Sequence, residues 1–471
     1  MFFERRNRWS LFSTVSLTAM AVGVQALANP ANPVIVAGDV AISGLGTSQV
    51  VVDNGSMRSI VNWEEFSVGS GESTLINQVS NDAAILNRVT GGNMSEIYGS
   101  LTSNGRVYLI NENGIVIGAS GQVGTAGFVA STLDADDAQF LGGGDMVFSQ
   151  GVSAGGGIEV HGKIRSVSGG DIFLLSREIE IGESAELSAE GTVGLGAGEE
   201  ILLRPTDSGE GRISIRAGKG KIVNKGRIEA AAAELRAAGG NEYALAINNT
   251  GVVRATGVSK SGGKVVLTGG GKVRNTGKLV ATKKVVVRST RRIENAGEIR
   301  AADAAGKGGQ IVMESPDIVL EAGSLLDVSA ALGGGSMFIG GGYQGSGSSK
   351  AGEAVDIAAN AQSVSVAAGA VLDASATQSG DAGEIVVWSD GTTSFAGSAI
   401  ADGGKGFIEI SGREHIVYQG SVSAKGGMVL FDPGTVEIIA DTDNDGIPDI
   451  ADFNVTLGAD ADTDGIDDAF D

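Results

Sequence analysis

One short unit recurs four times between residues 220 and 300, and it restricts the possible folds of this chain strongly. The unit is an apolar run, then Asn-x-Gly, then a second apolar run, and its asparagines are Asn224, Asn249, Asn275 and Asn295. They lie 25, 26 and 20 residues apart. A related unit, "GSLLDVSAALGGG", returns 46 residues later as "GAVLDASATQSG". Such periods indicate a solenoid in which each repeat forms about one turn.

The segments between these units are short and rich in β-branched residues, as in "KVVLT", "KVVVRS", "QIVME" and "EIVVW". Short runs bounded by Gly and Asn predict strands, and 76 glycines against 6 prolines suit many turns around a narrow core. We predict an all-β fold, a right-handed parallel β-helix with an N-terminal cap that protects the end strands. The stretch "AAAELRAA", residues 231–238, fits a helix about as well as a strand followed by a turn.

Residues 1–28 have the pattern of a secretory signal peptide. Arg5, Arg6 and Arg8 precede the apolar stretch from Trp9 to Val24, and the small-residue cleavage site follows at residues 26–28. A membrane anchor is the alternative, but the apolar stretch is shorter than the ~20 residues that span a bilayer. We therefore expect an exported protein that begins near Asn29. The chain has no cysteine, which suits a protein that stays unfolded until it has left the periplasm.

The stretch "RVYLINENGIVIG", residues 106–118, places Asn111, Glu112, Asn113 and Gly114 between two strand-like runs. Asn-Gly between alternating apolar residues is a strong signal for a β-hairpin with a type I′ turn. That interpretation explains the shape of the stretch but gives it no function.

Four motifs between residues 60 and 134 give the chain a resemblance to a known family. They are "NW-x-x-F" at 62–66, "NRVT" at 87–90, "L-x-SNG-x-V-x-LIN-x-NGI" at 101–115 and "GF-x-ASTLD" at 127–134. Together they resemble the secretion domain of the filamentous haemagglutinins and high-molecular-weight adhesins of two-partner secretion. The likeness weakens but continues through "VWSDGTTSFAG" to "LFDPGTVEI", near residue 440.

This resemblance implies a two-partner secretion domain over residues 29–300 and a continuation of the β-helix over 301–440. It also implies export through a TpsB-type β-barrel partner in the outer membrane, which recognises the N-terminal region. The family turn is usually Asn-Pro-Asn-Gly, and here Glu112 replaces the proline. The residues to which the resemblance assigns a secretion role are Asn62, Trp63, Phe66, Asn87, Arg88, Asn111, Asn113 and Gly114.

The function that follows is attachment by a secreted or surface-bound adhesin of a Gram-negative bacterium. We expect a monomer, with a glycan or protein receptor on a host cell or other surface. Two alternatives belong to other classes: a β-helical stalk for a larger toxin or cytolysin, and a β-helical enzyme that acts on polysaccharides.

The last 31 residues carry eleven aspartates and no basic residue, so they supply half of the formal net charge of −22. Two copies of D-x-D-x-D-G-x-x-D lie 19 residues apart and resemble thrombospondin type 3 repeats. Carboxylates at positions 1, 3, 5, 9 and 12, with Gly at 6, are typical of calcium loops. We predict weak calcium binding by Asp441, Asp443, Asp445, Asp449, Asp452, Asp460, Asp462, Asp464, Asp468 and Asp471.

Little in the sequence indicates catalysis. The two histidines, His161 and His415, and the lack of cysteine exclude zinc sites and Cys/His nucleophiles. Outside the tail we find no local cluster of carboxylates with basic residues, so we expect no enzymatic activity. The acidic charge argues against nucleic-acid binding. Trp63, Trp388 and Tyr343 could be sugar-binding platforms, but packing roles are the simpler interpretation.

Overall fold

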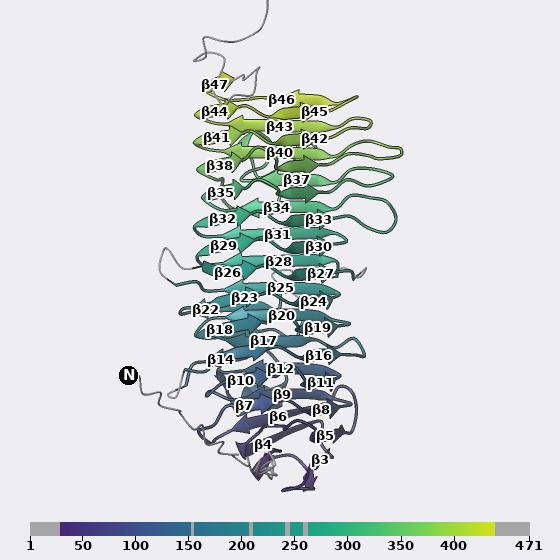
Figure 1. Ribbon diagram of the computed structural model, residues 1–471, viewed down its shortest axis with the longest axis vertical. Helices are drawn as coiled ribbons and strands as arrows, with labels where there is room; N and C mark the ends of the chain where they lie inside the picture. Colours follow the sequence, from purple (N-terminus) through teal and green to yellow (C-terminus); the bar gives the residue numbers. More distant parts are fainter. Residues whose placement is uncertain (1–28, 152–154, 207–210, 241–244, 258–261, 439–471) are drawn as a thin grey trace, which may run out of the picture.

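Three long, mainly parallel β-sheets wind around a common axis as one β-helix (Figure 1). The structure is a computed structural model, and it describes residues 29–438 except 152–154, 207–210, 241–244 and 258–261. From β6 (Ala84–Val89) onward, each turn of the solenoid, here called a coil, adds one strand to sheet 1, then to sheet 2, then to sheet 3. The predicted all-β, right-handed parallel β-helix with an N-terminal cap is confirmed.

Sheet 1 contains β1 (Ala31–Ala37), β4 (Arg58–Glu65), β6 (Ala84–Val89), β9 (Arg106–Ile110), β12 (Gly127–Ser131), β17 (Ile172–Ser176), β20 (Thr192–Ala197), β25 (Ala232–Ala237), β28 (Lys264–Gly269), β31 (Lys284–Ser289), β34 (Gln310–Glu314), β37 (Ser336–Ile339), β40 (Glu384–Ser389), β43 (Phe407–Gly412) and β46 (Met428–Leu430). Sheet 2 contains β7 (Ser95–Ile97), β10 (Ile115–Ile117), β15 (Ile158–Val160), β18 (Glu178–Ile181), β23 (Lys221–Asn224), β26 (Leu245–Asn249), β29 (Lys272–Asn275), β32 (Arg292–Asn295), β35 (Asp317–Leu320), β38 (Ser363–Val366), β41 (Thr392–Phe395), β44 (His415–Tyr418) and β47 (Thr435–Ile438). Sheet 3 contains β2 (Val40–Ser43), β3 (Gln49–Asn54), β5 (Ser73–Gln78), β8 (Ser100–Ser103), β11 (Gln122–Thr125), β16 (Lys163–Ser166), β19 (Glu186–Ala189), β24 (Arg227–Ala230), β27 (Val252–Ala255), β30 (Lys278–Ala281), β33 (Glu298–Ala301), β36 (Leu325–Asp327), β39 (Val371–Asp373), β42 (Ser398–Ile400) and β45 (Ser421–Ser423).

The cap is formed by two antiparallel pairings at the N-terminal end. Strand β1 pairs with β4, and β2 pairs with β3. All other neighbours in the three sheets are parallel. The first coils therefore have partners on the side where no earlier coil exists, which closes two of the three sheet edges there.

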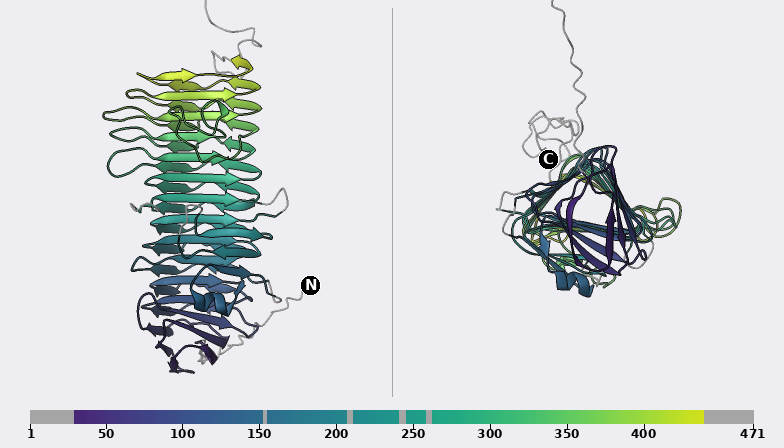
Figure 2. Two further views of the ribbon diagram at one scale, coloured as in Figure 1. Left: turned by 180° about the vertical axis from the view of Figure 1, so that it is seen from behind. Right: turned by 90° about the horizontal axis from the view of Figure 1, so that it is seen from below.

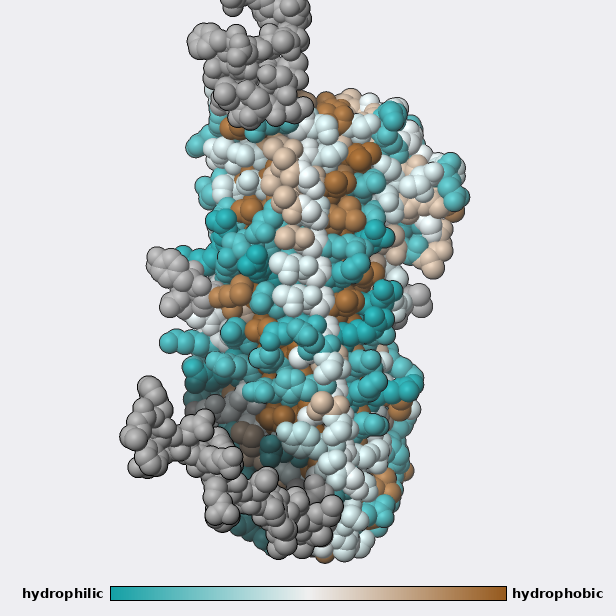
Figure 3. Space-filling view, viewed as in Figure 1, coloured by the Kyte–Doolittle hydropathy of each residue, from teal (hydrophilic) through white to brown (hydrophobic). Residues whose placement is uncertain are grey.

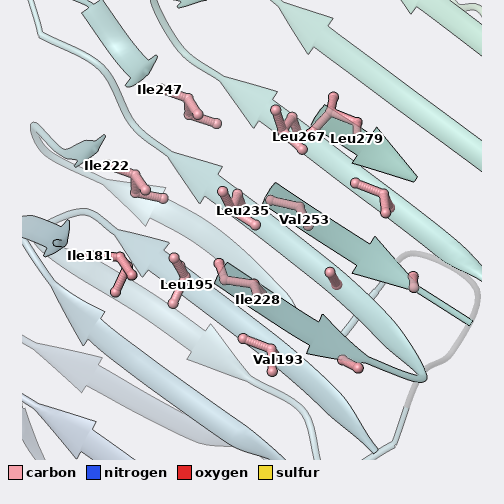
Figure 4. Close-up of a cluster of buried hydrophobic side chains, with 14 of the residues drawn as sticks. Ile181, Val193, Leu195, Ile222, Ile228, Leu235, Ile247, Val253, Leu267 and Leu279 are labelled. Atoms are coloured by element: carbon pink, nitrogen blue, oxygen red, sulfur yellow. The ribbon is translucent and has the colours of Figure 1, made fainter. Parts of the chain in front are cut away.

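Aliphatic side chains of successive coils stack inside the solenoid (Figure 4). Leu195, Leu235 and Leu267 are register partners on neighbouring strands of sheet 1, and Ile222 and Ile247 face them from sheet 2. All five are fully buried. Burying each such side chain stabilises the fold by about 1.5–3 kcal/mol, so the repeated apolar position is what each coil contributes to the core.

The asparagines of the repeat form a buried ladder where sheet 2 turns into sheet 3. The side-chain amide of Asn224 donates to Asn249, that of Asn249 to Asn275, and that of Asn275 to Asn295, each at 2.7 Å. The ladder ends where Asn295 donates to the carbonyl of Gly297 at 3.0 Å. A Cβ on Gly277 would lie 2.1 Å from the carbonyl oxygen of Gly251, which explains why glycine follows two residues after the asparagine.

Two excursions leave the solenoid and cover parts of the outer side of sheet 1. The first is a four-stranded antiparallel side sheet of β13 (Asp134–Ala135), β14 (Met146–Ser149), β21 (Glu200–Leu203) and β22 (Ile213–Ala217), with helix α1 (Asp137–Gly142). The end-on view in Figure 2 shows α1 outside the triangular cross-section of the coils. The second excursion, residues 340–361, contains the short helix η1 (Tyr343–Gly345) and packs against Trp388 and Phe407.

Two local expectations can be compared with the structure. The all-β prediction did not include α1, where Asp136 caps the first turn by accepting from the backbone of Gln139 at 2.9 Å. For residues 231–238 the strand interpretation is right, because β25 lies in the middle of sheet 1 with neighbours on both sides. Burial of Ala233 and Leu235 in the core outweighs their helical propensity.

Figure 3 shows one long side of the solenoid, with hydrophilic residues around its middle and apolar residues in narrow columns between them. Many of the charged side chains pair across neighbouring coils, such as Lys225 with Glu180 and Lys278 with Glu298, both at 2.7 Å. Within the described residues no helix is long and apolar enough to cross a membrane.

Candidate functional site: the motif network of the first coils

The "NW-x-x-F" motif lies at the end of β4 in the first coils. Trp63 and Phe66 are buried and meet edge to face, with ring centroids 5.6 Å apart. Asn62 points to the opposite, outer side of sheet 1, and its side-chain oxygen is buried without a hydrogen-bond partner among the described residues. The two aromatic residues are therefore core residues, which confirms the packing interpretation of Trp63.

The "NRVT" motif begins on β6, the strand that pairs with β4 in sheet 1. Its side chains make contacts on both faces of the sheet. Asn87 accepts a hydrogen bond from the indole N–H of Trp63 at 3.0 Å and donates to the carbonyl of Tyr108 at 3.2 Å. Arg88 points outwards and pairs with Asp134 at 2.9 Å and with Asp137 at 2.7 Å. Burial lowers the pKa of Arg88, but the bonds to the two aspartates outweigh this effect and raise it overall. The guanidinium thus fixes the side sheet and α1 to the solenoid.

The "NENG" stretch forms the corner between β9 in sheet 1 and β10 in sheet 2. Asn111 is fully buried, and its amide donates to the carbonyl of Asn93 and to the hydroxyl of Ser95, both at 3.0 Å. The side-chain oxygen of Asn111 accepts from the backbone N–H of Asn113 at 3.0 Å, and the Asn113 amide donates to the carbonyl of Gly91 at 2.8 Å. Both asparagines therefore tie this corner to the preceding coil.

The hairpin interpretation of this stretch is wrong. Strand β9 pairs in parallel with β6 and β12, and β10 pairs in parallel with β7 and β15. The backbone N–H of Gly114 donates to the carbonyl of Asn111 at 3.1 Å, which closes a β-turn. Only Gly114, at φ +127°, has the positive φ that a type I′ turn would require at two positions. The asparagines serve for their side-chain hydrogen bonds and not for a left-handed backbone.

Glu112 brings the corner close to the other motifs. Burial, and then the charge of Asp134, raise the pKa of this carboxyl, whereas the backbone N–H of Gly151 and the charge of Arg88 lower it. Residues from three of the four motifs, Arg88, Glu112 and Asp134, thus interact electrostatically on one side of the first coils. We define the side chains of Trp63, Asn87, Arg88, Asn111 and Asn113 as the motif network.

The remaining predicted residues lie elsewhere. Trp388 is 5% exposed and donates to Asp390 at 3.1 Å, and Tyr343 contacts Phe407 with centroids 5.7 Å apart. His161 lies near Glu159 and His415 near Thr435, far apart in the chain. The ten predicted calcium ligands and the signal peptide lie outside the described residues. In the described part, no group of three or more His, Asp or Glu side chains is arranged to hold a metal ion.

A cleft that the sequence did not indicate lies on the outer side of sheet 1, between the two excursions. It has a volume of about 880 Å³, and charged residues from separate coils meet there. The expectation that carboxylates and basic residues do not cluster is therefore wrong. However, the carboxylates have structural partners: Asp171 binds Arg212 at 2.7 Å, and Glu234 accepts from the backbone N–H of Arg212 at 2.9 Å. A hydrogen bond from Arg288 lowers the pKa of Asp356.

The capped β-helix and the motif network on its first coils define the class of the protein, an N-terminal β-helical secretion module of an exported protein. Residues 35–281 match the family model described as "TPS secretion domain", a match over just more than half of the chain. The chain belongs to this family, and it carries the secretion domain of a two-partner secretion exoprotein. The family is a secretion module and not an enzyme class.

Comparisons with individual proteins agree with this assignment. The crystal structure of the HMW1 secretion domain from Haemophilus influenzae is 25% identical and superposes with a TM-score of 0.65, covering 86% of this chain and all of the other. A "Heme/hemopexin-binding protein" of Haemophilus influenzae is 30% identical over 273 residues, which are 55% of this chain and 29% of the relative. A second protein of that name is 36% identical over 97 residues, 21% of this chain and 10% of the relative. The chain thus spans less than a third of these curated relatives.

Proposed function

We propose that the protein is exported across the outer membrane of a Gram-negative bacterium by a TpsB-type β-barrel partner and then serves in attachment to a surface. The observation that carries the proposal is the motif network, because it joins the family's motifs on the coils next to the N-terminal cap. In an exported chain these coils emerge and fold early, and later coils add to them as to a template. The expected signal peptide over residues 1–28 supplies the first step, transfer to the periplasm.

Export is tested by localisation of an Asn111→Ala/Asn113→Ala variant in the cell that makes the protein. We expect the extracellular amount to fall by about tenfold, because the buried amide of Asn111 and the half-buried amide of Asn113, which both bind the preceding coil, are lost. Loss of each amide costs roughly 1–3 kcal/mol. Immunoblots of periplasm, surface and medium measure the distribution.

An Asn77→Ala/Asn248→Ala variant is the matched control, because both residues lie on strands and point away from the core. Its export should equal that of the wild type. A Glu112→Pro variant restores the usual family turn and should be exported at least as well, since proline suits the second position of such a turn. Equal export of the Asn111→Ala/Asn113→Ala variant and the wild type would contradict a recognition role for this corner.

A second candidate is that the module serves a larger exoprotein with another activity, such as a toxin, a cytolysin or a ligand-capture protein. The supporting observation is that the matched relatives extend far beyond the aligned part and are described as binding heme and hemopexin. Export of the chain without binding of cells or surfaces would favour this candidate.

The acidic tail is proposed to bind calcium once it is outside the cell. Titration of the full chain with Ca²⁺ in a calorimeter should give a dissociation constant of about 10⁻⁴–10⁻³ M, as in other extracellular modules. An Asp445→Asn/Asp464→Asn variant changes the fifth position of both loops and should lose the heat signal, whereas Asp171→Asn, in the β-helix, should keep it. Absence of heat from the wild type up to about 10 mM Ca²⁺ would contradict the proposal.

A further inference from the structure

The cleft on sheet 1 has a floor of four neighbouring strands, β20, β25, β28 and β31. One wall comes from the side sheet and the other from the second excursion, which contributes Asp356. Figure 2 shows both excursions on the outside of the coils, and the cleft is lined by residues from several coils and from both excursions. The cleft is therefore a surface groove along the axis and not a cavity inside the coils.

Two lysines stand next to each other in the floor. Lys264 on β28 and Lys284 on β31 are register partners, so they project from coils about 4.8 Å apart on the same side of the sheet. Burial lowers the pKa of Lys284, and Asp356 lies 3.6 Å from its amino group. Lys264 has no ion pair or side-chain hydrogen bond with any described residue. The floor thus holds positive charge that the protein only partly neutralises.

The arginines around these lysines are held in place by carboxylates. Arg212 pairs with Asp171 at 2.7 Å, and Arg236 with Glu234 at 3.3 Å. Arg212 also donates through Nε to the carbonyl of Arg204, but one guanidinium offers five N–H donors. Arg212 can therefore orient an anionic group without losing its structural bonds.

A smaller cavity of about 110 Å³ continues the groove beyond the pair of Arg212 and Asp171. Both spaces share Asp171, Pro205 and Arg212 in their linings. The smaller one is also lined by Arg58, Arg106, Arg204 and Tyr108. Burial raises the pKa of Tyr108, and this effect outweighs the opposing effect of the nearby charges of Arg58 and Arg106. The tyrosine therefore presents a neutral hydroxyl, and this space has the size for one carboxylate, sulfate or phosphate group.

We propose that this groove binds an acidic oligosaccharide, with one anionic group in the arginine-lined cavity and another on Lys264 and Lys284. The proposal deepens the attachment function and rests on it. A sugar chain can lie along an open polar groove that crosses several coils, with anionic groups meeting fixed cations. An extended peptide has no free strand edge to pair with here, because the floor strands have neighbours on both sides.

The test uses the purified full chain and fluorescently labelled oligosaccharides of eight units. A heparin fragment carries sulfate and carboxylate, an oligogalacturonate carries carboxylate only, and a malto-oligosaccharide is neutral. Fluorescence anisotropy should show binding of at least one acidic probe, weakening as salt increases, and no binding of the neutral probe. Binding of heparin alone would show that sulfate is required, and binding of both would show that a carboxylate is sufficient.

A Lys264→Gln/Lys284→Gln variant should weaken binding by at least about tenfold, since it removes two direct charge contacts. The matched control is Lys221→Gln/Lys278→Gln, which makes the same charge change on sheets 2 and 3 and should stay within about twofold. A Lys264→Arg/Lys284→Arg variant keeps the charge and should retain binding, which separates loss of charge from loss of folding. Equal weakening in both glutamine variants, equal binding of the neutral probe, or no binding of either acidic probe would overturn the proposal. Because purified protein is used, these results are independent of whether export fails in cells.

Discussion

Secretion of an Ile97→Asp variant is expected to fall by more than about tenfold, whereas Ile408→Asp should reduce it by less than about threefold. Both isoleucines are fully buried in the same core, so a carboxylate is equally unfavourable at the two positions. They differ in order along the chain, because Ile97 belongs to the first coils and Ile408 to a late one. If folding outside the cell proceeds coil by coil from the N-terminus, an early defect removes the template for all later coils.

Pulse-labelling with immunoprecipitation from the medium measures the rate of secretion. Ile97→Val is the control for position, because it removes one methyl group and costs about 0.5–1.5 kcal/mol without introducing a charge. Similar secretion rates for Ile97→Asp and Ile408→Asp would show that folding does not proceed from the N-terminus.

The second large effect is expected in the asparagine ladder. Asn275→Ala should lower the local free energy of unfolding by about 2–4 kcal/mol, because the buried oxygen of Asn295 loses its partner and the buried amide of Asn249 keeps only its 3.3 Å bond to the carbonyl of Gly251. A solenoid can unfold in parts, so the measurement is hydrogen exchange of the amides in β26, β29 and β32, resolved by peptide.

Two variants calibrate this result. Asn224→Ala removes the first member of the ladder and leaves only the oxygen of Asn249 unpaired, so about 1–2 kcal/mol is expected. Asn248→Ala changes an outward-pointing neighbour on the same strand as Asn249 and should stay within about 0.5 kcal/mol of the wild type. Equal protection in Asn275→Ala and Asn248→Ala would mean that the ladder contributes little.

The repeat predicts the fold well because every coil needs the same kinds of buried side chain at the same positions. Apolar positions such as Leu235 and Leu267 recur at one place in the coil, and the buried asparagines recur at one corner. The structure explains why the repeat contains Asn-x-Gly, because the asparagine side chains of successive coils hydrogen-bond to one another. The ladder was not predicted because each repeat was considered alone.

What the sequence could not predict depends on contacts between non-equivalent coils. The corner at Asn111 looks like a hairpin locally, and only the parallel pairing of β9 and β10 with other coils separates the two possibilities. The side sheet combines β14 with β21, which lie about fifty residues apart and have no repeat in common. The groove residues Lys264 and Lys284 likewise belong to ordinary strands, and their shared environment arises from the two excursions beside them.

The motif residues were found through their resemblance to a family and not through chemistry, and their role in secretion remains a prediction. Asn87, Arg88 and Asn111 form side-chain hydrogen bonds within the fold. Substitution of any of them therefore affects folding as well as any role in recognition by the transporter. Stability measurements on the purified variants are therefore needed beside each export assay.

The length and stability of one coil limit the force with which folding outside the cell can pull on the rest of the chain. A coil of 20 to 26 residues measures about 70–90 Å as an extended chain and contributes a net stability of about 1–4 kcal/mol. Docking one coil outside the cell can then pull on the chain still inside the transporter with a mean force on the order of a few piconewtons. Such a force moves an unfolded chain but does not break a covalent cross-link, and a chain without a single cysteine presents no disulfide to the pore.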